Sequence, residues 1–367
     1  MTIDFNFLTI LLLALIAQGI FASIVLVFKV ENKSANRYLS LLIFLLALWL
    51  TDSFFRTGGV YRQDPDFYFL PIYFSLGFGP LIYFYTRTLT RANFRLTSRD
   101  WLHLVPVVIQ GSFYIYLQTR DYAYRRNFWY EVHRPYLYDV ELVLSFGSIL
   151  LYLVASRWQI ERYKQKIKNA FSSTHRITLN WLAALHFILA MLAFFWLLES
   201  LVRLIWNYYP ATPLSAMTIG LTVLIMAAGG ILQKDLSAVT SDFPKRSGSE
   251  SEIDQHLVRR IQTIMQDQEL FLRQELTLKE FALEVGAGPR AVSQAINQGL
   301  GMRFIDFVNS YRVERVKALI DKEQMGHLNL TGIALESGFN AKSTFNRVFK
   351  KMTGQRPSEY QKKAQNT

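Results

Sequence analysis

Apolar residues in the first 232 positions gather in seven long stretches that are separated by short polar or basic loops. A helix needs about 20 mostly apolar residues to cross the hydrocarbon core of a bilayer. Core helices of a soluble protein would show a polar face, and these stretches mostly do not. We therefore predict seven membrane-spanning helices, at Phe5–Phe28, Tyr38–Phe55, Phe67–Thr86, Trp101–Gln118, Leu137–Ser156, Leu179–Ile205 and Ala216–Leu232.

The pattern changes after residue 236. Residues 237–252 are polar and include Pro244 and Gly248, a composition that is typical of a linker. From Ile253 the apolar residues return at helical spacing on one face, which predicts a soluble amphipathic helix. We therefore expect a membrane domain at 1–236, a linker at 237–252 and a soluble domain at 253–367.

The soluble domain contains a short internal repeat of the form A-x-x-x-G, at Ala282–Gly286 and again at Ala334–Gly338. A small residue lets two helices cross closely, and a glycine readily adopts the left-handed conformation of a sharp turn. A helix start follows each copy, with Gly288 as N-cap and Pro289 at the first helical position in one, and Asn340 as N-cap in the other. The repeat predicts two helix-turn-helix units.

Each of the two helices that follow these turns has an apolar stripe and a polar face. Val292 and Ile296 form the stripe of the first, and Phe345, Val348 and Phe349 form that of the second. On the polar faces, arginine, lysine, asparagine and similar side chains suit the base edges and phosphates of double-stranded DNA. The expected DNA-binding residues are Arg290, Gln294 and Asn297 in the first helix and Lys342, Ser343, Asn346, Arg347 and Lys350 in the second.

Residues 276–363 resemble the AraC/XylS family of transcription regulators. The resemblance is strongest in the second unit, where the matching positions are Gly338, Phe339, Ser343, Phe345, Phe349, Lys350, Gly354, Pro357 and Tyr360. It implies two helix-turn-helix units joined by a long helix, here Phe304–Leu319, and sequence-specific DNA binding. Gly288 and Val292 depart from the family pattern, which implies that the first unit contributes mainly backbone contacts.

The membrane half is similar to membrane-embedded regulators in which several spans precede this same domain. The matching residues are 79–85 (GPLIYFY) and 101–106 (WLHLVP), with an arginine-rich loop between them. With the seven predicted spans, the two resemblances give an expected all-α fold, a seven-helix transmembrane bundle followed by a cytoplasmic double helix-turn-helix domain. A regulator of this kind also allows a homodimer and contact with RNA polymerase.

The loop charges indicate the orientation of the spans, because Lys and Arg concentrate in cytoplasmic loops. With the amino terminus outside, the inside loops contain Lys29, Lys33, Arg37, Arg87, Arg91, Arg95, Arg99, Arg157, Arg162, Lys164, Lys166, Lys168 and Arg176. The outside loops contain fewer cations, although one of them holds Arg120, Arg125, Arg126 and Arg134. We expect a multi-pass protein of the inner (cytoplasmic) membrane, with its amino terminus outside and its carboxyl-terminal domain in the cytoplasm.

Ionisable residues within the spans are candidates for sensing a signal, because charges are costly in hydrocarbon. Glu199 and Arg203 lie four residues apart in the sixth span, and His186 lies on the same helix. These three are the expected sensing residues, for a small molecule or an envelope signal. The alternative is that Glu199–Arg203, like Asp52–Arg56, is a self-neutralising pair.

The residue types present argue against several other classes of protein. The chain has no cysteine, so disulfides and thiolate metal sites are excluded, and its six histidines show no metal-binding spacing. No catalytic or nucleotide-binding motif is visible, so we expect neither an enzyme nor a cofactor. The competing function is a transporter or channel with an accessory DNA-binding tail, which predicts Gly-broken half-helices in two repeats; the sequence shows no such repeat.

Composition agrees with a membrane protein but does not by itself indicate DNA binding. The chain is 51% hydrophobic, and its mean hydropathy of +0.15 is high for a soluble protein. Much of its net charge of +12 lies in the predicted inside loops. Residues 253–367 carry 17 Lys and Arg against 12 Asp and Glu, so DNA binding would depend on a local basic face.

Overall fold

The computed structural model describes residues 2–64, 66–67, 70–91, 94–173, 179–206, 214–233, 254–321 and 329–365. Across these ranges the regular structure is helical, apart from one isolated antiparallel bridge between Phe171 and Thr277. The all-α expectation is therefore confirmed for the described residues. The chain divides into two compact units, the first made of Met1–Glu161 and Leu179–Thr240, the second of Arg162–Thr178 and Ser241–Thr367.

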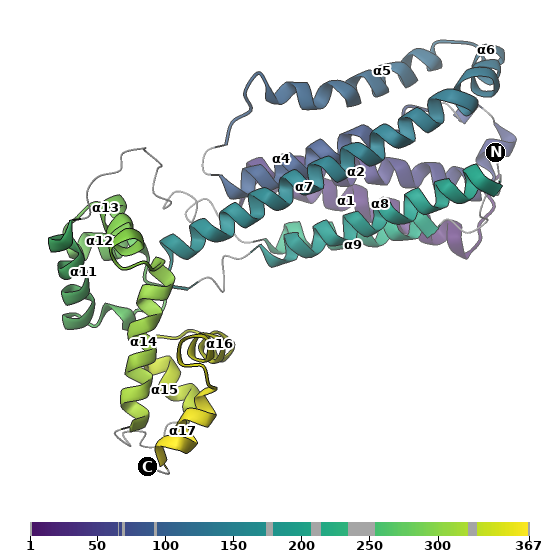
Figure 1. The fold of residues 1–367 in the computed structure, drawn as a ribbon. Coiled ribbons are helices and arrows are strands. Elements are labelled where there is room, and N and C mark those ends of the chain that lie inside the picture. The colour runs from purple at the N-terminus through teal and green to yellow at the C-terminus, as the bar shows by residue number, and fades with distance from the viewer. Residues whose placement is uncertain are drawn as a thin grey trace. The chain divides into compact units, whose positions relative to one another are not determined.

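The long helices of the first unit lie side by side (Figure 1). Its helices are α1 (Phe7–Phe28), α2 (Lys33–Thr57), α3 (Val60–Gln63), α4 (Phe78–Thr90), α5 (Val105–Gln118), α6 (Tyr122–Phe128), α7 (Tyr138–Ala170), α8 (Asn180–Trp206) and α9 (Leu214–Leu232). Four helices in the described part of the chain are long and apolar enough to cross a membrane, namely Phe7–Phe28, Lys33–Thr57, Tyr122–Ala170 and Trp181–Val202; the apolar helix Ala216–Leu232 is shorter.

The predicted third span differs from the structure in its first half. The helix there, α4, begins at Phe78 and has 13 residues, so it is about 20 Å long, less than the thickness of a bilayer. Pro71 lies in a bend before it, and Pro80 lies in its first turn, where proline needs no amide partner. A helix predicted over Phe67–Thr86 is therefore wrong for residues 70–74, and Ser75–Gly77 form only a short 3-10 turn before α4.

The fifth predicted span is part of a much longer helix. We expected helix over Leu137–Ser156, whereas α7 continues to Ala170. No glycine or proline interrupts residues 157–170, and Arg157 pairs with Glu161 one turn later at 2.9 Å. Most of the cations predicted for the third inside loop are consequently on a helix.

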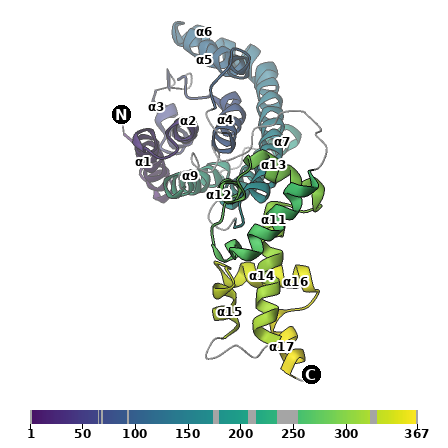
Figure 2. The ribbon, with the colours of Figure 1, turned by 90° about the vertical axis from the view of Figure 1, so that its left-hand side faces the viewer.

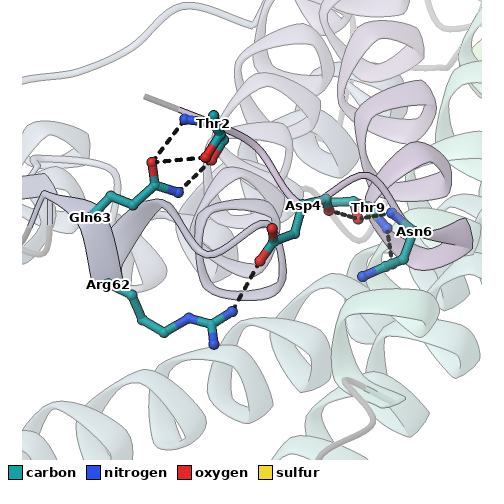
Figure 3. A network of polar contacts seen from close by, with 6 residues as sticks. All are labelled: Thr2, Asp4, Asn6, Thr9, Arg62 and Gln63. Carbon is teal, nitrogen blue, oxygen red and sulfur yellow. Dashed lines mark hydrogen bonds and ion pairs between the residues drawn. The ribbon is translucent and has the colours of Figure 1, made fainter.

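Polar contacts tie the beginning of the chain to α3 (Figure 3). Asn6 Oδ1 accepts a hydrogen bond from Thr9 N at 3.0 Å, and Thr9 Oγ1 accepts one from Asn6 N at 3.0 Å, which forms a capping box at the start of α1. Arg62 on α3 pairs with Asp4 at 3.1 Å. These contacts define where α1 begins.

The second unit contains two helix groups joined by one helix, α14 (Phe304–Asp321), as Figures 1 and 2 show. The first group is α11 (Gln255–Asp267), α12 (Leu278–Val285) and α13 (Pro289–Gln294); the second is α15 (Leu330–Glu336), α16 (Lys342–Thr353) and α17 (Pro357–Gln365). Phe304 and Phe307 of α14 belong to the core of the first group, whereas Val313 and Val316 belong to the core of the second. The predicted linking helix over Phe304–Leu319 is confirmed.

The predictions for the turns of this unit have mixed outcomes. Gly286 and Gly338 both have positive φ, at 68° and 88°, as the repeat predicted. Gly288 is the N-cap of α13, also as predicted. Asn340 is not the N-cap of α16; that residue is Ala341, which gives the helix no side-chain cap. The predicted linker at 237–252 lies outside the described residues.

Gly338 is the turn residue with the least room for a side chain. A Cβ atom there would lie 2.4 Å from Phe271 O, whereas one at Gly301 (φ 66°) would meet nothing within 4 Å. Gly338→Ala should therefore lower the free energy of unfolding by at least about 3 kcal/mol, and the control Gly301→Ala by about 1–2 kcal/mol, the backbone term alone. Urea titration of residues 253–367 expressed alone, which we expect to be soluble and helical, measures both. Equal losses would contradict the close approach at Gly338.

Candidate nucleic-acid interface

The two glycine turns have the same local hydrogen bonds. In the first, Gly286 N donates to Leu283 O at 3.0 Å and Ala287 N donates to Ala282 O at 3.1 Å. In the second, the equivalent bonds run from Gly338 to Leu335 and from Phe339 to Ala334, at 3.1 and 2.9 Å. Such bonds close the carboxyl end of a helix and reverse the chain. The repeat read from the sequence thus corresponds to a repeated backbone turn.

The helix after the second turn, α16, has one buried and one exposed face. Phe345 and Phe349 are almost fully buried, their ring centroids are 5.6 Å apart, and the ring of Tyr360 lies 5.6 Å from that of Phe349. Val348 is also buried. The opposite face is solvent-exposed and contains the five predicted residues of this helix, Lys342, Ser343, Asn346, Arg347 and Lys350.

The exposed face of α16 is suited to the major groove by size and charge. Lys342 and Lys350 are eight residues apart, about 12 Å along a helix, which matches the width of the groove. Lys342, Arg347 and Lys350 make no ion pair with another described residue. Lys351, one position further round the helix, is instead held by Asp306 at 2.7 Å. The cations of this face are therefore available to phosphates and base edges.

The corresponding helix after the first turn, α13, offers a smaller polar face. It has six residues and passes into a wide turn at Ala295–Gly299. Its predicted DNA-binding residues Arg290, Gln294 and Asn297 are half-buried. Gln294 Nε2 donates to Gln298 Oε1 at 3.0 Å, and Asn297 Nδ2 donates to Ser293 Oγ at 3.1 Å. These side chains already have partners on their own helix.

The largest fully buried side chain of the unit, for which we had predicted no role, is that of Arg312 on α14. Arg312 is 2% exposed, donates from Nε to Phe271 O at 2.7 Å and from Nη2 to Arg273 O at 2.8 Å. Burial lowers the pKa of Arg312 to about 10, so the side chain is still charged at neutral pH. The signal was present in the sequence, because Arg312 lies four residues from Val308 and from Val316, on the apolar stripe of α14.

The predicted sensing residues lie on α8, and the structure describes His186 in full. His186 is buried, and its Nδ1 donates to Leu182 O at 2.6 Å, which leaves Nε2 without a partner among the described residues. The side chains of Glu199 and Arg203 lie outside the described residues. The structure therefore places one of the three residues and does not test the pair.

Polar groups that the sequence did not bring together surround Asp52 near the end of α2. Asp52 accepts hydrogen bonds from Tyr61 OH at 2.6 Å and from Tyr73 OH, and it pairs with Arg56 at 3.4 Å. The predicted Asp52–Arg56 pair therefore forms, but the carboxylate has two tyrosine partners as well. Tyr61 and Tyr73 are 9 and 21 residues from Asp52, so no local sequence pattern predicts their bonds to its carboxylate.

A second polar group adjoins this cluster. The rings of Tyr73 and Tyr114 are 5.5 Å apart, and Tyr114 OH donates to Glu141 Oε2 at 3.0 Å. His133 Nε2 lies 3.6 Å from the same carboxylate oxygen and is 3% exposed as a residue. The first unit thus holds ionisable groups in its interior, which the sequence analysis had not singled out.

Comparison with known proteins agrees with the geometry of the second unit. The family described as "Helix-turn-helix domain" matches residues 281–363, from inside α12 to inside α17. An "Uncharacterized HTH-type transcriptional regulator" of Staphylococcus aureus is 34% identical over 93 residues, and another from S. aureus strain COL is 34% identical over 92 residues. Each match covers 25% of this chain and 12% of the relative. No solved structure matches.

The exposed face of α16 predicts different roles for two of its cations. If Arg347 reads guanine, Arg347→Ala should cost about 1–3 kcal/mol on the preferred duplex and relax the choice of one base. If Lys350 holds a phosphate, Lys350→Ala should weaken all sequences alike and reduce the salt slope by about one.

Titration of residues 253–367 against preferred and scrambled duplexes at several salt concentrations measures both effects. Lys362→Ala, at an exposed lysine of α17, is the matched control and should change neither. Unchanged affinity in both α16 variants, with binding retained, would mean that another face of the unit contacts DNA.

Proposed function

We propose, from the AraC-type helix-turn-helix domain at residues 281–363, that this chain is a membrane-bound, sequence-specific DNA-binding transcription regulator. The observation that carries the proposal is the exposed face of α16, where polar and cationic side chains lie opposite a buried aromatic core. The second unit supplies two helix-turn-helix units, which bind successive major grooves of double-stranded DNA. The α16 face reads the bases, and the smaller α13 face contributes mainly backbone contacts.

The membrane attachment rests on the four candidate spans. The seven-span bundle read from the sequence stays a proposal, in which the shorter helices α4, α5 and α9 are the remaining three spans. The proposed orientation places the amino terminus outside and the second unit in the cytoplasm, where DNA is. Arg125, one of four cations in an outside loop, pairs with Asp66 at 2.5 Å.

A signal at the first unit then changes DNA binding by the second. His186, Glu199 and Arg203 remain the proposed sensing residues, for a small molecule or an envelope signal. The interior cluster around Asp52 and Glu141 is a second candidate, because its carboxylates and tyrosines are packed together inside the helix bundle. A homodimer and RNA polymerase are the proposed protein partners.

Selection of duplexes from a random library by the purified full chain in lipid nanodiscs tests the DNA-binding function. We expect the enriched duplexes to share one motif, because base contacts distinguish sequences while phosphate contacts do not. The Arg347→Ala, Lys350→Ala double variant is the control and should enrich weakly. Enrichment without any shared motif would contradict sequence-specific binding.

Reporter fusions after Gly59, Tyr122, Asn169 and Gly248 test the orientation. We expect activity typical of the outside from fusions at Gly59 and Tyr122, and activity typical of the cytoplasm from those at Asn169 and Gly248, because of the distribution of Lys and Arg. Outside-type activity at Asn169 or Gly248 would overturn the proposed topology.

Glu199→Gln tests the sensing role, since glutamine keeps the shape of the side chain and removes its charge. We expect normal membrane insertion, seen by immunoblot of the membrane fraction, and an altered response of a target promoter. Glu31→Gln, at an exposed loop carboxylate, is the matched control and should respond as the unaltered chain does. If Glu199→Gln responds normally under every condition, Glu199 has no sensing role, and its place in the span is explained by a self-neutralising pair with Arg203.

A further inference from the structure

The end of α7 belongs structurally to the second unit. Although α7 starts in the first unit, Arg162–Thr178 group with Ser241–Thr367. Tyr163, Ile167 and Ala170 are each 1% exposed, so this part of α7 is packed on its apolar side. A helix that contains a candidate span therefore ends within the same compact unit as the helix-turn-helix domain.

The three residues that follow α7, Phe171–Ser173, are here called the strap. Phe171 forms the antiparallel bridge with Thr277, and Ser172 N donates to Leu276 O at 3.0 Å. Thr277 is the N-cap of α12, so the strap lies against the start of the first helix-turn-helix unit. Phe171 and Ser172 are buried, at 8% and 2% exposed.

The strap also contacts the linking helix and the chain just before α16. Arg312 donates to Ser172 O and to Ser172 Oγ, each at 3.4 Å. Asn340 Nδ2 donates to Ser173 Oγ at 2.6 Å. The two contacts from Arg312 are long and the one from Asn340 is short, so Asn340 makes the stronger side-chain contact to the strap.

The contact at Asn340 affects the end of the helix that is proposed to enter the groove. α16 starts two residues later and has no side-chain cap at its amino end. With one donor engaged by Ser173, the Asn340 amide is turned toward the strap. If the strap leaves, Arg312 keeps its shorter bonds to Phe271 O and Arg273 O, so its charge stays paired.

We propose that the strap is an autoinhibitory element, which holds Asn340 in the resting state and releases it when a signal moves α7. The proposal rests on the proposed function and names the element that carries the signal to the DNA-binding surface. Docked, the strap lowers DNA affinity; released, it frees the Asn340 amide and the start of α16 to contact the duplex.

The absence of cysteine from the chain allows a direct test. The full chain with Ser173→Cys and Asn340→Cys, in nanodiscs, should form an intramolecular disulfide under mild oxidant. The oxidised form should then bind a duplex enriched by the unaltered chain on the order of tenfold more weakly than the reduced form, because apparent affinity falls with the competent fraction. The single variants Ser173→Cys and Asn340→Cys are the controls and should not respond to oxidant.

A second variant removes the contact without a cross-link. Ser173→Ala should bind the same duplex more tightly, by up to about fivefold, the equivalent of one hydrogen bond. Ser310→Ala, which removes a bond from Ser310 Oγ to Phe307 O at 2.7 Å, is the matched control and should leave affinity unchanged.

Three results would overturn autoinhibition by the strap. These are equal binding by the oxidised form, tighter binding by the oxidised form, and unchanged or weaker binding by Ser173→Ala; if no disulfide forms, the Ser173→Ala result decides. If the reduced double variant does not bind DNA, the Ser173→Ala result decides. Failure of the unaltered chain to enrich any duplex would instead overturn the proposed function.

Discussion

The second unit depends on one buried charge, the guanidinium of Arg312. Its short bonds to Phe271 O and Arg273 O hold the segment before α12 against the linking helix. A buried cation without such partners would be strongly destabilising, so these carbonyls have to remain in place. The close approach of Gly338 to Phe271 O brings the second glycine turn to the same point. One side chain thus relates the two helix groups of the second unit to each other.

The same guanidinium connects the domain to the end of α7. Ser172 accepts only long bonds from the Arg312 guanidinium, whose short bonds go to Phe271 O and Arg273 O. The strap is therefore attached to Arg312 but is not needed to keep this cation hydrogen-bonded. The helix that leads to it, α7, has 33 residues and is about 50 Å long at 1.5 Å per residue. That length exceeds the thickness of the hydrocarbon core of a bilayer, so α7 is long enough to continue beyond a membrane span.

Local patterns predicted most of the second unit, because they depend on neighbouring residues. The helical spacing of Phe345 and Phe349 gave the buried face of α16, and the glycine at 338 gave its turn. Long-range contacts were not predictable in this way. Nothing near Asn340 in the sequence indicates that its amide bonds Ser173 and not the start of α16, and the cluster around Asp52 joins residues from separate helices. Hydropathy likewise marks apolar stretches but not where a helix begins within them.

The central claim, that this protein reads DNA while it is held in a membrane, is tested most directly by cross-linking in the native cell. Cells with the tagged full chain are fixed with formaldehyde, the membrane fraction is isolated, and the DNA bound to the tagged protein is sequenced. The account predicts discrete sites that share one motif in the membrane fraction, and far fewer sites for a chain in which Lys342, Arg347 and Lys350 are all alanine. DNA recovered from the membrane fraction at the level of untagged cells would contradict it.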